Sequence, residues 1–465
     1  MRGVISAAGY VPYRRLQRSE IATFFGSGGG RGTRSVASYD EDTTTMGAEA
    51  ARQALASTDA RPTAVWFATA DPAYLEKTNA TTIHAALRLD ADVTALDTGS
   101  AVRSGVGSLL AALRSRDSIL VVASDIRVGL PTGADESAQG DAAAAILVGD
   151  DTDGPVIAEY LGGAQRTEEF IDRWRTPGDP RPRQWEEKFG EVKLLPLTAE
   201  AFDAALKDAQ LNVDQVDIAI VTGPHTRAVK GAAGRLGVKK VADDLASAVG
   251  QSGTAHPALL LANALEQAEP GQVIALVSLS DGVDVALFRT TDAITQYRSA
   301  RPVAQQVESS ADIPYGKFLM WRGMVHVEPP RRPEPDRISA SVSGRSEDWK
   351  YAFVGSRDRS TGALHLPPQR VSREGGAQDE MEAAPMADVR GTIATFTIDR
   401  IAYSPSPPIV FAIVDFDGGG RLPVELCDVD ADSLAMGRQV EMTFRRLFTA
   451  DGIHNYFWKA RPVRG

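Results

Sequence analysis

Short apolar runs alternate with helical stretches twice along the first 290 residues of this chain. In the first half, residues 64–69, 118–124 and 142–148 each form a run typical of a buried strand. Residues 216–221 and 273–278 repeat the pattern in the second half, again with helical segments between them. Alternating strands and helices favour an α/β sheet that is covered on both faces. The repeated order of strands and helices also predicts that the two halves arose by an internal duplication.

Composition excludes several classes of protein. The chain has 465 residues, which predicts roughly two to four domains, and its formal net charge of −11 argues against a basic surface for nucleic acid. No apolar run approaches the roughly 20 residues that span a bilayer, and the apolar stretch at the N-terminus is too short for a secretory signal. We therefore expect a cytoplasmic protein without a membrane span. Cys427 is the one cysteine of the sequence, so we expect neither an intrachain disulfide nor a cysteine-based zinc site.

A change of composition after about residue 292 divides the chain into three predicted parts. Residues 1–295 form the α/β part, in which the charged, tryptophan-containing stretch 167–193 is expected to cap or extend the first half. Residues 296–350 include a stretch rich in Pro and Arg, which is typical of a linker or wrapping arm. Residues 351–465 contain several short strand-like runs separated by turn signals, the pattern of a small β-barrel.

The α/β part contains five short motifs, at 39–46, 77–81, 123–125, 223–225 followed by Lys230, and 249–252. Their order and spacing along the whole of this part resemble those of thiolase-fold condensing enzymes of the hydroxymethylglutaryl-CoA synthase group. The resemblance implies a duplicated five-layer core of the αβαβα type, a homodimer formed through that core, and a CoA thioester as ligand or substrate.

The C-terminal part resembles the zinc-ribbon and OB-fold module that accompanies certain thiolases. In such relatives the two parts are often separate chains, whereas here they are fused. The four cysteine positions of the ribbon fall on other residues, which cannot form a tetrahedral thiolate site, so no structural zinc is predicted. The matching stretches are 318–323, 329–333, 355–357, 367–371, 417–425 and 457–462, and the four ribbon positions are Asp358, Thr361, Ser372 and Gly375.

The departures from the synthase pattern concern its reactive groups. By the resemblance, such synthases use a cysteine nucleophile, a glutamate acid/base and a histidine. The cysteine position falls on Val102 and the glutamate position on Ala70, whereas the histidine is retained as His225. An asparagine that helps to polarise the thioester carbonyl is replaced by Gln251. Val102 lies at a helix start, where the dipole would lower the pKa of a thiol, but valine has nothing to ionise, so no acyl-enzyme is expected there.

The remaining polar residues are candidates for the functional site, and a structural role is weighed against the functional one. His225 could donate a hydrogen bond to a thioester oxygen or act as a general base, or be a histidine satisfied by the backbone. His256 and Asp71 are further candidate catalytic residues: His256 could face the same pocket as His225, and Asp71 has a solvated loop carboxylate as its structural alternative. Surface cations could instead pair with the phosphates of CoA. These candidate CoA-binding residues are Lys77, Arg103 and Lys230.

These observations predict an acyl-CoA-related protein that needs no cofactor besides a CoA thioester. The favoured function is a non-catalytic or reduced-activity subunit of a thiolase or acyltransferase complex, with a thiolase chain as its partner. Loss of the nucleophile alone can cost on the order of a million-fold in rate in a covalent mechanism. One alternative is a cysteine-independent lyase, a retro-aldolase acting on β-hydroxyacyl-CoA through His225. Another is a purely structural assembly protein.

Overall fold

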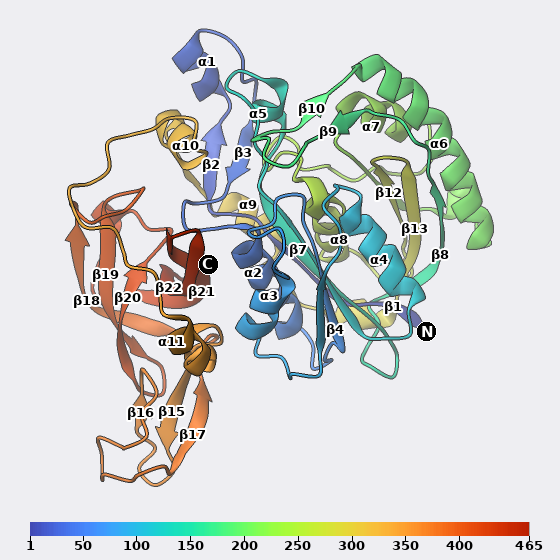
Figure 1. Cartoon of the computed structure of the whole chain (residues 1–465). Coiled ribbons are helices and arrows are strands. Elements are labelled where there is room, and N and C mark those ends of the chain that lie inside the picture. The colour runs from blue at the N-terminus through green and yellow to red at the C-terminus, as the bar shows by residue number, and fades with distance from the viewer. Residues whose placement is uncertain (465) are drawn as a thin grey trace. The chain divides into compact units, whose positions relative to one another are not determined.

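The computed structural model describes residues 1–464 (Figure 1) and divides them into two units. Each unit is assembled from segments that are distant in the sequence. Helices α2 (Thr43–Ala56), α3 (Ala80–Ala86) and α10 (Tyr315–Trp321) each contribute residues to both. Unit 1 comprises Met1–Ala37, Glu49–Thr81 and Asp90–Phe318, and unit 2 comprises Ser38–Ala48, Thr82–Leu89 and the described residues from Leu319 onward.

Unit 1 is built on a nine-stranded sheet of order β11-β12-β13-β8-β1-β7-β6-β4-β5. Five of its strands, β4, β6, β7, β11 and β12, coincide with the apolar runs of the sequence, because a strand covered on both faces must be apolar on both. Strand bounds are β1 (Arg2–Tyr10), β4 (Ala64–Ala68), β5 (Thr94–Asp97), β6 (Ile119–Asp125), β7 (Ala142–Asp150), β8 (Ala158–Arg166), β11 (Ile218–Thr222), β12 (Val273–Leu279) and β13 (Val283–Thr290).

The sheet repeats one topology on either side of its middle. Outward from β1, the neighbours β7 and β6 pair antiparallel, and β4 and β5 then pair parallel. Outward from β8, the neighbours β13 and β12 again pair antiparallel, β11 pairs parallel, and a single parallel bridge from Ala219 to Val241 takes the place of a fifth strand. The halves meet where β1 and β8 pair at Gly3 and Val4. A Cβ at Gly3 would lie 2.0 Å from the Ala158 carbonyl oxygen, so this close approach requires glycine.

Two helices form a layer that contacts strands of both halves. Helix α4 (Ser104–Arg114) packs on β6 and β13, and α8 (His256–Leu265) packs on β7 and β11. On β12, Ile274 and Leu276 belong to this central core, whereas Ala275 and Val277 face a second core, because successive side chains of a strand point to opposite faces. The second core lies beneath α6 (Glu187–Asp208) and α7 (Thr226–Ala233), which cover the other face of the second half.

The remaining elements of unit 1 are short. They include two small strand pairings outside the main sheet, β14-β2-β3 and β10-β9. None of the helices within residues 1–464 combines the length and the apolar character that crossing a bilayer requires. The bounds are β2 (Arg14–Gln17), α1 (Ser19–Phe25), β3 (Thr33–Val36), α5 (Ala134–Ala138), β9 (Arg173–Trp174), β10 (Arg183–Gln184), α9 (Val303–Glu308) and β14 (Ala311–Asp312).

Unit 2 contains a closed five-stranded barrel of order β18-β19-β20-β22-β21 and a small three-stranded sheet, β16-β15-β17. Phe353, Phe444 and Trp458 are buried in this unit, where their rings pack in tilted and stacked pairs. The bounds are α11 (Ala340–Arg345), α12 (Glu347–Lys350), β15 (Val354–Asp358), β16 (Leu364–His365), β17 (Met381–Pro385), β18 (Gly391–Asp399), β19 (Ile409–Phe416), β20 (Arg421–Leu426), β21 (Gln439–Ala450) and β22 (Ile453–Pro462).

A buried ionic cluster ties the acidic segment of unit 2, residues 38–48, to the barrel. The ammonium of Lys459 on β22 lies 3.0 Å from Asp40 Oδ2 and also pairs with Glu425. On β21, the Arg445 guanidinium lies 2.5 Å from Glu41 Oε1 and pairs with a further buried carboxylate. Both cationic side chains are 0% exposed. The acidic motif at 39–46 is therefore held by buried charge pairs.

Candidate functional site

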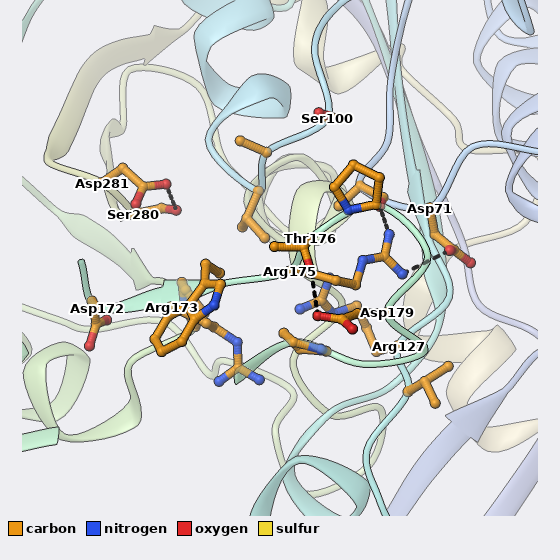
Figure 2. A pocket seen from close by; sticks show the side chains of 18 of the residues that line it. Asp71, Ser100, Arg127, Asp172, Arg173, Arg175, Thr176, Asp179, Ser280 and Asp281 are labelled. Carbon is orange, nitrogen blue, oxygen red and sulfur yellow. Dashed lines mark hydrogen bonds and ion pairs between the residues drawn. The ribbon is translucent and has the colours of Figure 1, made fainter. Parts of the chain in front are cut away.

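A cavity of about 600 Å³ lies in unit 1 at the carboxyl ends of five strands. Strands β4, β5 and β6 run parallel, so the residues that follow them meet at one edge of the sheet. Pro224 after β11 and the stretch 279–281 at the end of β12 line the cavity from the second half. Residues 170–182 supply much of the remaining wall (Figure 2). Ligand sites of α/β proteins commonly lie outside the carboxyl ends of their strands.

Val102 lies in the wall of this cavity, as its position before a helix predicted. The turn between β5 and α4 places Ser100, Ala101 and Val102 in the wall, and α4 begins at Ser104. Gly99 has a φ of +69°, and a Cβ there would lie 2.5 Å from Ser104 Oγ. Ser104 Oγ accepts a hydrogen bond from the Ala101 amide at 3.3 Å. The helix start therefore presents a branched hydrocarbon side chain to the cavity, with no thiol.

Ala70 and Asp71 enter the cavity from the end of β4. The Ala70 amide donates to Asp125 Oδ1 at 2.7 Å. Asp71 Oδ1 pairs with Arg175 Nη1 at 3.2 Å, and the same guanidinium donates to the Ala70 carbonyl (Figure 2). Burial raises the pKa of Asp71, while the charge of Arg175 opposes that rise. Of the three candidate catalytic residues, Asp71 is the one that lines the cavity.

His225 is at the start of α7 but is absent from the cavity wall. Its Nδ1 accepts from the Ala228 amide at 3.1 Å, so Nε2 carries the proton and donates to the Glu187 carbonyl at 2.7 Å. The residue is 2% exposed. Gly190 of α6 packs on it, since a Cβ at Gly190 would lie 2.8 Å from His225 Cδ2 and 2.6 Å from Asp172 Oδ1. Both ring nitrogens are occupied, and the catalytic role of His225 stays a prediction.

His256 and Gln251 also lie away from the cavity wall. His256 is 2% exposed, its Nδ1 is 3.1 Å from Ser252 Oγ, and burial lowers its pKa to about 4. The ring is therefore neutral at pH 7. Gln251 uses its Oε1 to accept from the Gly253 amide at 2.7 Å. Both side chains stabilise the turn before α8, and their predicted roles toward a thioester carbonyl remain untested.

The three cations expected at CoA phosphates have protein partners or lie on the surface. Arg103 Nε pairs with Asp284 Oδ2 at 2.8 Å, and its Nη1 donates to the Asp281 carbonyl at 2.7 Å. Lys77 Nζ donates to Thr78 O and to Thr81 Oγ1 at 2.9 and 2.8 Å. Lys230 is exposed on α7. None of the three lines the cavity.

The arginines of the cavity are not among the site residues that the sequence predicts. Arg127 follows β6, and Arg173 and Arg175 lie in the wall segment 170–182. The available signal was the Arg173-Trp174-Arg175 stretch in a segment expected to cap the first half. Figure 2 shows these side chains between Asp71 on one side and Asp281 on the other. The cavity therefore combines apolar walls with charged groups of both signs.

The four ribbon positions come together in unit 2 without a cysteine. Asp358 Oδ1 accepts from the Ser360 amide at 2.8 Å and from the Thr361 amide at 3.3 Å. Hydrogen bonds from Ser372 and Ser360 hold the pKa of Asp358 well below its usual range. A Cβ at Gly375 would lie 3.3 Å from Thr361 Cγ2. Among residues 1–464, no group of three or more His, Cys, Asp or Glu side chains is placed to hold a metal ion.

Fold and site together define a class of protein: a thiolase-like α/β unit joined to an OB-fold barrel. The family model described as the C-terminal OB-fold domain of ChsH2 matches residues 384–445, so the predicted OB fold is confirmed. A solved structure, MvaS in complex with 3-hydroxy-3-methylglutaryl coenzyme A, superposes with a TM-score of 0.58 at 20% identity. The superposition covers 73% of this chain and 94% of that one, which confirms the predicted thiolase-like fold.

The chain is also similar in sequence to hydroxymethylglutaryl-CoA synthases. The chain is 27% identical over 342 residues to the hydroxymethylglutaryl-CoA synthase of Methanopyrus kandleri, covering 68% of this chain and 95% of that protein. It is 29% identical over 347 residues to the synthase of Archaeoglobus fulgidus, covering 69% and 98%. The predicted resemblance to hydroxymethylglutaryl-CoA synthases is thereby confirmed.

Proposed function

We propose that this protein binds an acyl-CoA thioester in the cavity without forming an acyl-enzyme, as a non-catalytic or reduced-activity subunit of a thiolase or acyltransferase complex. The observation that carries the proposal is Val102 at the helix start that faces the cavity. A saturated side chain cannot attack the thioester carbon, so the thioester stays intact while bound.

Other side chains do not replace the missing nucleophile. Cys427 belongs to unit 2, is buried, and has a pKa raised well above its usual value by burial, so it supplies no thiolate. Ser100 lies in the cavity wall, but a serine nucleophile needs an adjacent base. His225 is not that base in this arrangement, because its two ring nitrogens already have hydrogen-bond partners.

The ligand class and the assembly follow from the resemblance. The structural neighbour MvaS was solved with 3-hydroxy-3-methylglutaryl coenzyme A, which supports a CoA thioester as the ligand here. A cavity of about 600 Å³ falls within the usual size of small-molecule sites. We further propose a homodimer through the α/β unit and a thiolase chain as partner. Strand β5 lies at the end of the sheet with Thr94 and Asp97 exposed, and such an edge strand can pair with a second chain.

A second candidate function is cysteine-independent cleavage of a β-hydroxyacyl-CoA. The observation that favours it is the Asp71 carboxyl inside the cavity, with a pKa raised by burial. As its carboxylate, Asp71 would remove the proton of the β-hydroxyl group. The Cα–Cβ bond would then break to give a carbonyl product and a thioester enolate, which takes up a proton. If Asp71 is the base, Asp71→Asn should abolish release of acetyl-CoA from a β-hydroxyacyl-CoA, whereas His225→Ala should not.

Restoring the nucleophile tests the favoured function. Val102→Cys, incubated with acetyl-CoA, should gain one acetyl group by intact-mass spectrometry, because a thiol at this helix start would face the bound thioester. Ser100→Cys is the matched control, two residues earlier in the same wall, and should acylate more slowly. The proposed function would be contradicted if Val102→Cys is not acylated and calorimetry shows that the protein binds no acyl-CoA.

A further inference from the structure

Residues 171–193 connect β8 to the buried part of α6 and cover His225; we call them the flap. The Glu187 carbonyl of the flap accepts a hydrogen bond from His225 Nε2 at 2.7 Å. Gly190 lies so close that an added Cβ would be 2.9 Å from His225 Nε2 and 2.6 Å from Asp172 Oδ1. Pro224, the chain neighbour of His225, lines the cavity, as does Asp172. The flap therefore covers a histidine that adjoins the cavity.

Little apolar surface of the flap is buried. Within residues 171–193, Asp172 and Gly190 alone are buried, and neither has an apolar side chain. The large apolar side chains face solvent instead: Trp185, Phe189 and Val192 are 63%, 46% and 60% exposed. Burial of apolar area is the main favourable term that holds a segment in place. A segment without it opens at a low free-energy cost, while the rest of the fold stays intact.

A proline marks the place where the flap joins the rest of α6. Pro196 lies inside this helix. It has no N–H to donate to the carbonyl four residues earlier, that of Val192, and its ring crowds the same carbonyl. Leu194 is buried beside the proline, and Phe170, just before the flap, packs on the second core. Both ends of the flap are thus anchored, and the helix is weakest next to it.

Ion pairs link the flap to the remainder of unit 1. Arg173 pairs with Asp135 on α5, and Arg175 Nη1 lies 3.2 Å from Asp71 Oδ1 after β4 (Figure 2). These four side chains are partly exposed. A pair of this kind changes an equilibrium constant by up to about fivefold. The closed flap is therefore held by polar contacts, each of which is weak.

We propose that the flap is an autoinhibitory cover that opens about Pro196 and thereby presents His225 to the cavity. By the resemblance, His225 is the one reactive group of the synthase pattern that this chain retains. In the closed state its Nε2–H is bound to the Glu187 carbonyl, and opening makes this donor available beside Pro224 in the cavity wall. A closed flap keeps His225 away from a bound thioester. The flap belongs to the chain itself, so its opening does not require that the cavity bind an acyl-CoA.

Pulsed labelling with diethyl pyrocarbonate, read by peptide mass spectrometry, tests the proposal on the full chain without ligand. The reagent modifies accessible imidazole nitrogens, and the exposed His326 serves as the internal reference. His225 should react at least about 100-fold more slowly than His326, because only the open flap exposes it. It should nevertheless react faster than global unfolding permits, as measured by hydrogen exchange of the β12 amides.

Variants of the flap arginines test what holds it closed. The double variant Arg173→Gln/Arg175→Gln removes both ion pairs to the remainder of unit 1 and should speed labelling of His225 by about 2- to 25-fold. Arg183→Gln is the matched control. Its ion pair, at 3.9 Å, is with Asp179, which belongs to the flap as well, so labelling should keep its rate.

Pro196→Ala tests the hinge and favours the folded helix. It restores the missing helical N–H and should slow labelling of His225 by about 5- to 100-fold. The proposal is overturned if His225 reacts as fast as His326, or only as fast as the β12 amides exchange. It is also overturned if neither Pro196→Ala nor the double variant changes the rate. No acyl-CoA is present, so these outcomes are distinct from failure of the proposed function, which is read from acyl-CoA binding.

Discussion

Replacing Lys459 by methionine should strongly destabilise unit 2. The ammonium is fully buried, lies 3.0 Å from Asp40 Oδ2 and pairs with Glu425. Desolvation alone would lower the pKa of Lys459, but the charges of Asp40, Tyr39 and Glu425 raise it well above its usual value. Lys459→Met keeps most of the side-chain volume and leaves two buried carboxylates without that cation. Breaking a buried ion pair in this way costs about 3–5 kcal/mol.

Hydrogen exchange of the barrel strands is the appropriate assay, because unfolding of a chain with two units need not be a single two-state transition. Amides of β22 that exchange by opening of unit 2 should exchange about 150- to 4000-fold faster in Lys459→Met, since 1.4 kcal/mol corresponds to a factor of ten. Arg421→Met is the control: its pair with Asp415 lies on the same barrel but is largely exposed. An equal and small effect of the two variants would refute the reasoning from buried charge.

Three further predictions concern pH, packing and metal. Because burial places the pKa of His256 at about 4, below its ordinary 6.5, the folded state binds fewer protons between these values. Stability is therefore complete above about pH 6.5 and falls by about 3 kcal/mol toward pH 4, and His256→Gln should flatten that part of the pH profile in urea titrations. Gly190→Ala should lower the free energy of unfolding by about 1–3 kcal/mol, because its Cβ would meet Asp172 and His225 within 3 Å. Gly107→Ala in α4, where the added Cβ meets nothing within 4 Å, should instead raise the free energy of unfolding by up to about 1 kcal/mol in the same urea titrations. Elemental analysis should find no stoichiometric zinc in the purified chain. A variant with cysteines at all four ribbon positions should bind about one zinc per chain. Stoichiometric zinc in the unmodified chain would contradict the first expectation.

The positions of five strands of the main sheet could be predicted along the chain because each of them is a short apolar run between polar segments. The runs at 118–124 and 273–278 correspond to β6 and β12, which hold equivalent places in the two halves. Helix α6 begins at Glu187, inside the charged stretch 167–193 that the sequence predicts to cap or extend the first half. Gly190 and Pro196 interrupt the helical pattern in its first turns, and packing on the second core overrides their low propensity.

Site residues were harder to predict, because lining a cavity depends on tertiary contacts. Val102 and Asp71 both line the cavity, since each follows one of two parallel neighbouring strands. His225 also follows a strand, yet the Glu187 carbonyl from the unpredicted start of α6 occupies its Nε2. Arg127 carries no local signal, because an arginine after a strand is ordinary, and its place in the cavity wall becomes visible only in three dimensions.

Mass spectrometry of the unmodified chain at equilibrium with acetyl-CoA tests the central claim most directly. Equilibrium dialysis should show the thioester bound, and the denatured chain should keep its unmodified mass, since no wall residue attacks the carbonyl carbon. An acetyl group attached to any residue of the cavity wall would contradict the account. Absence of bound thioester in the same dialysis would contradict it equally.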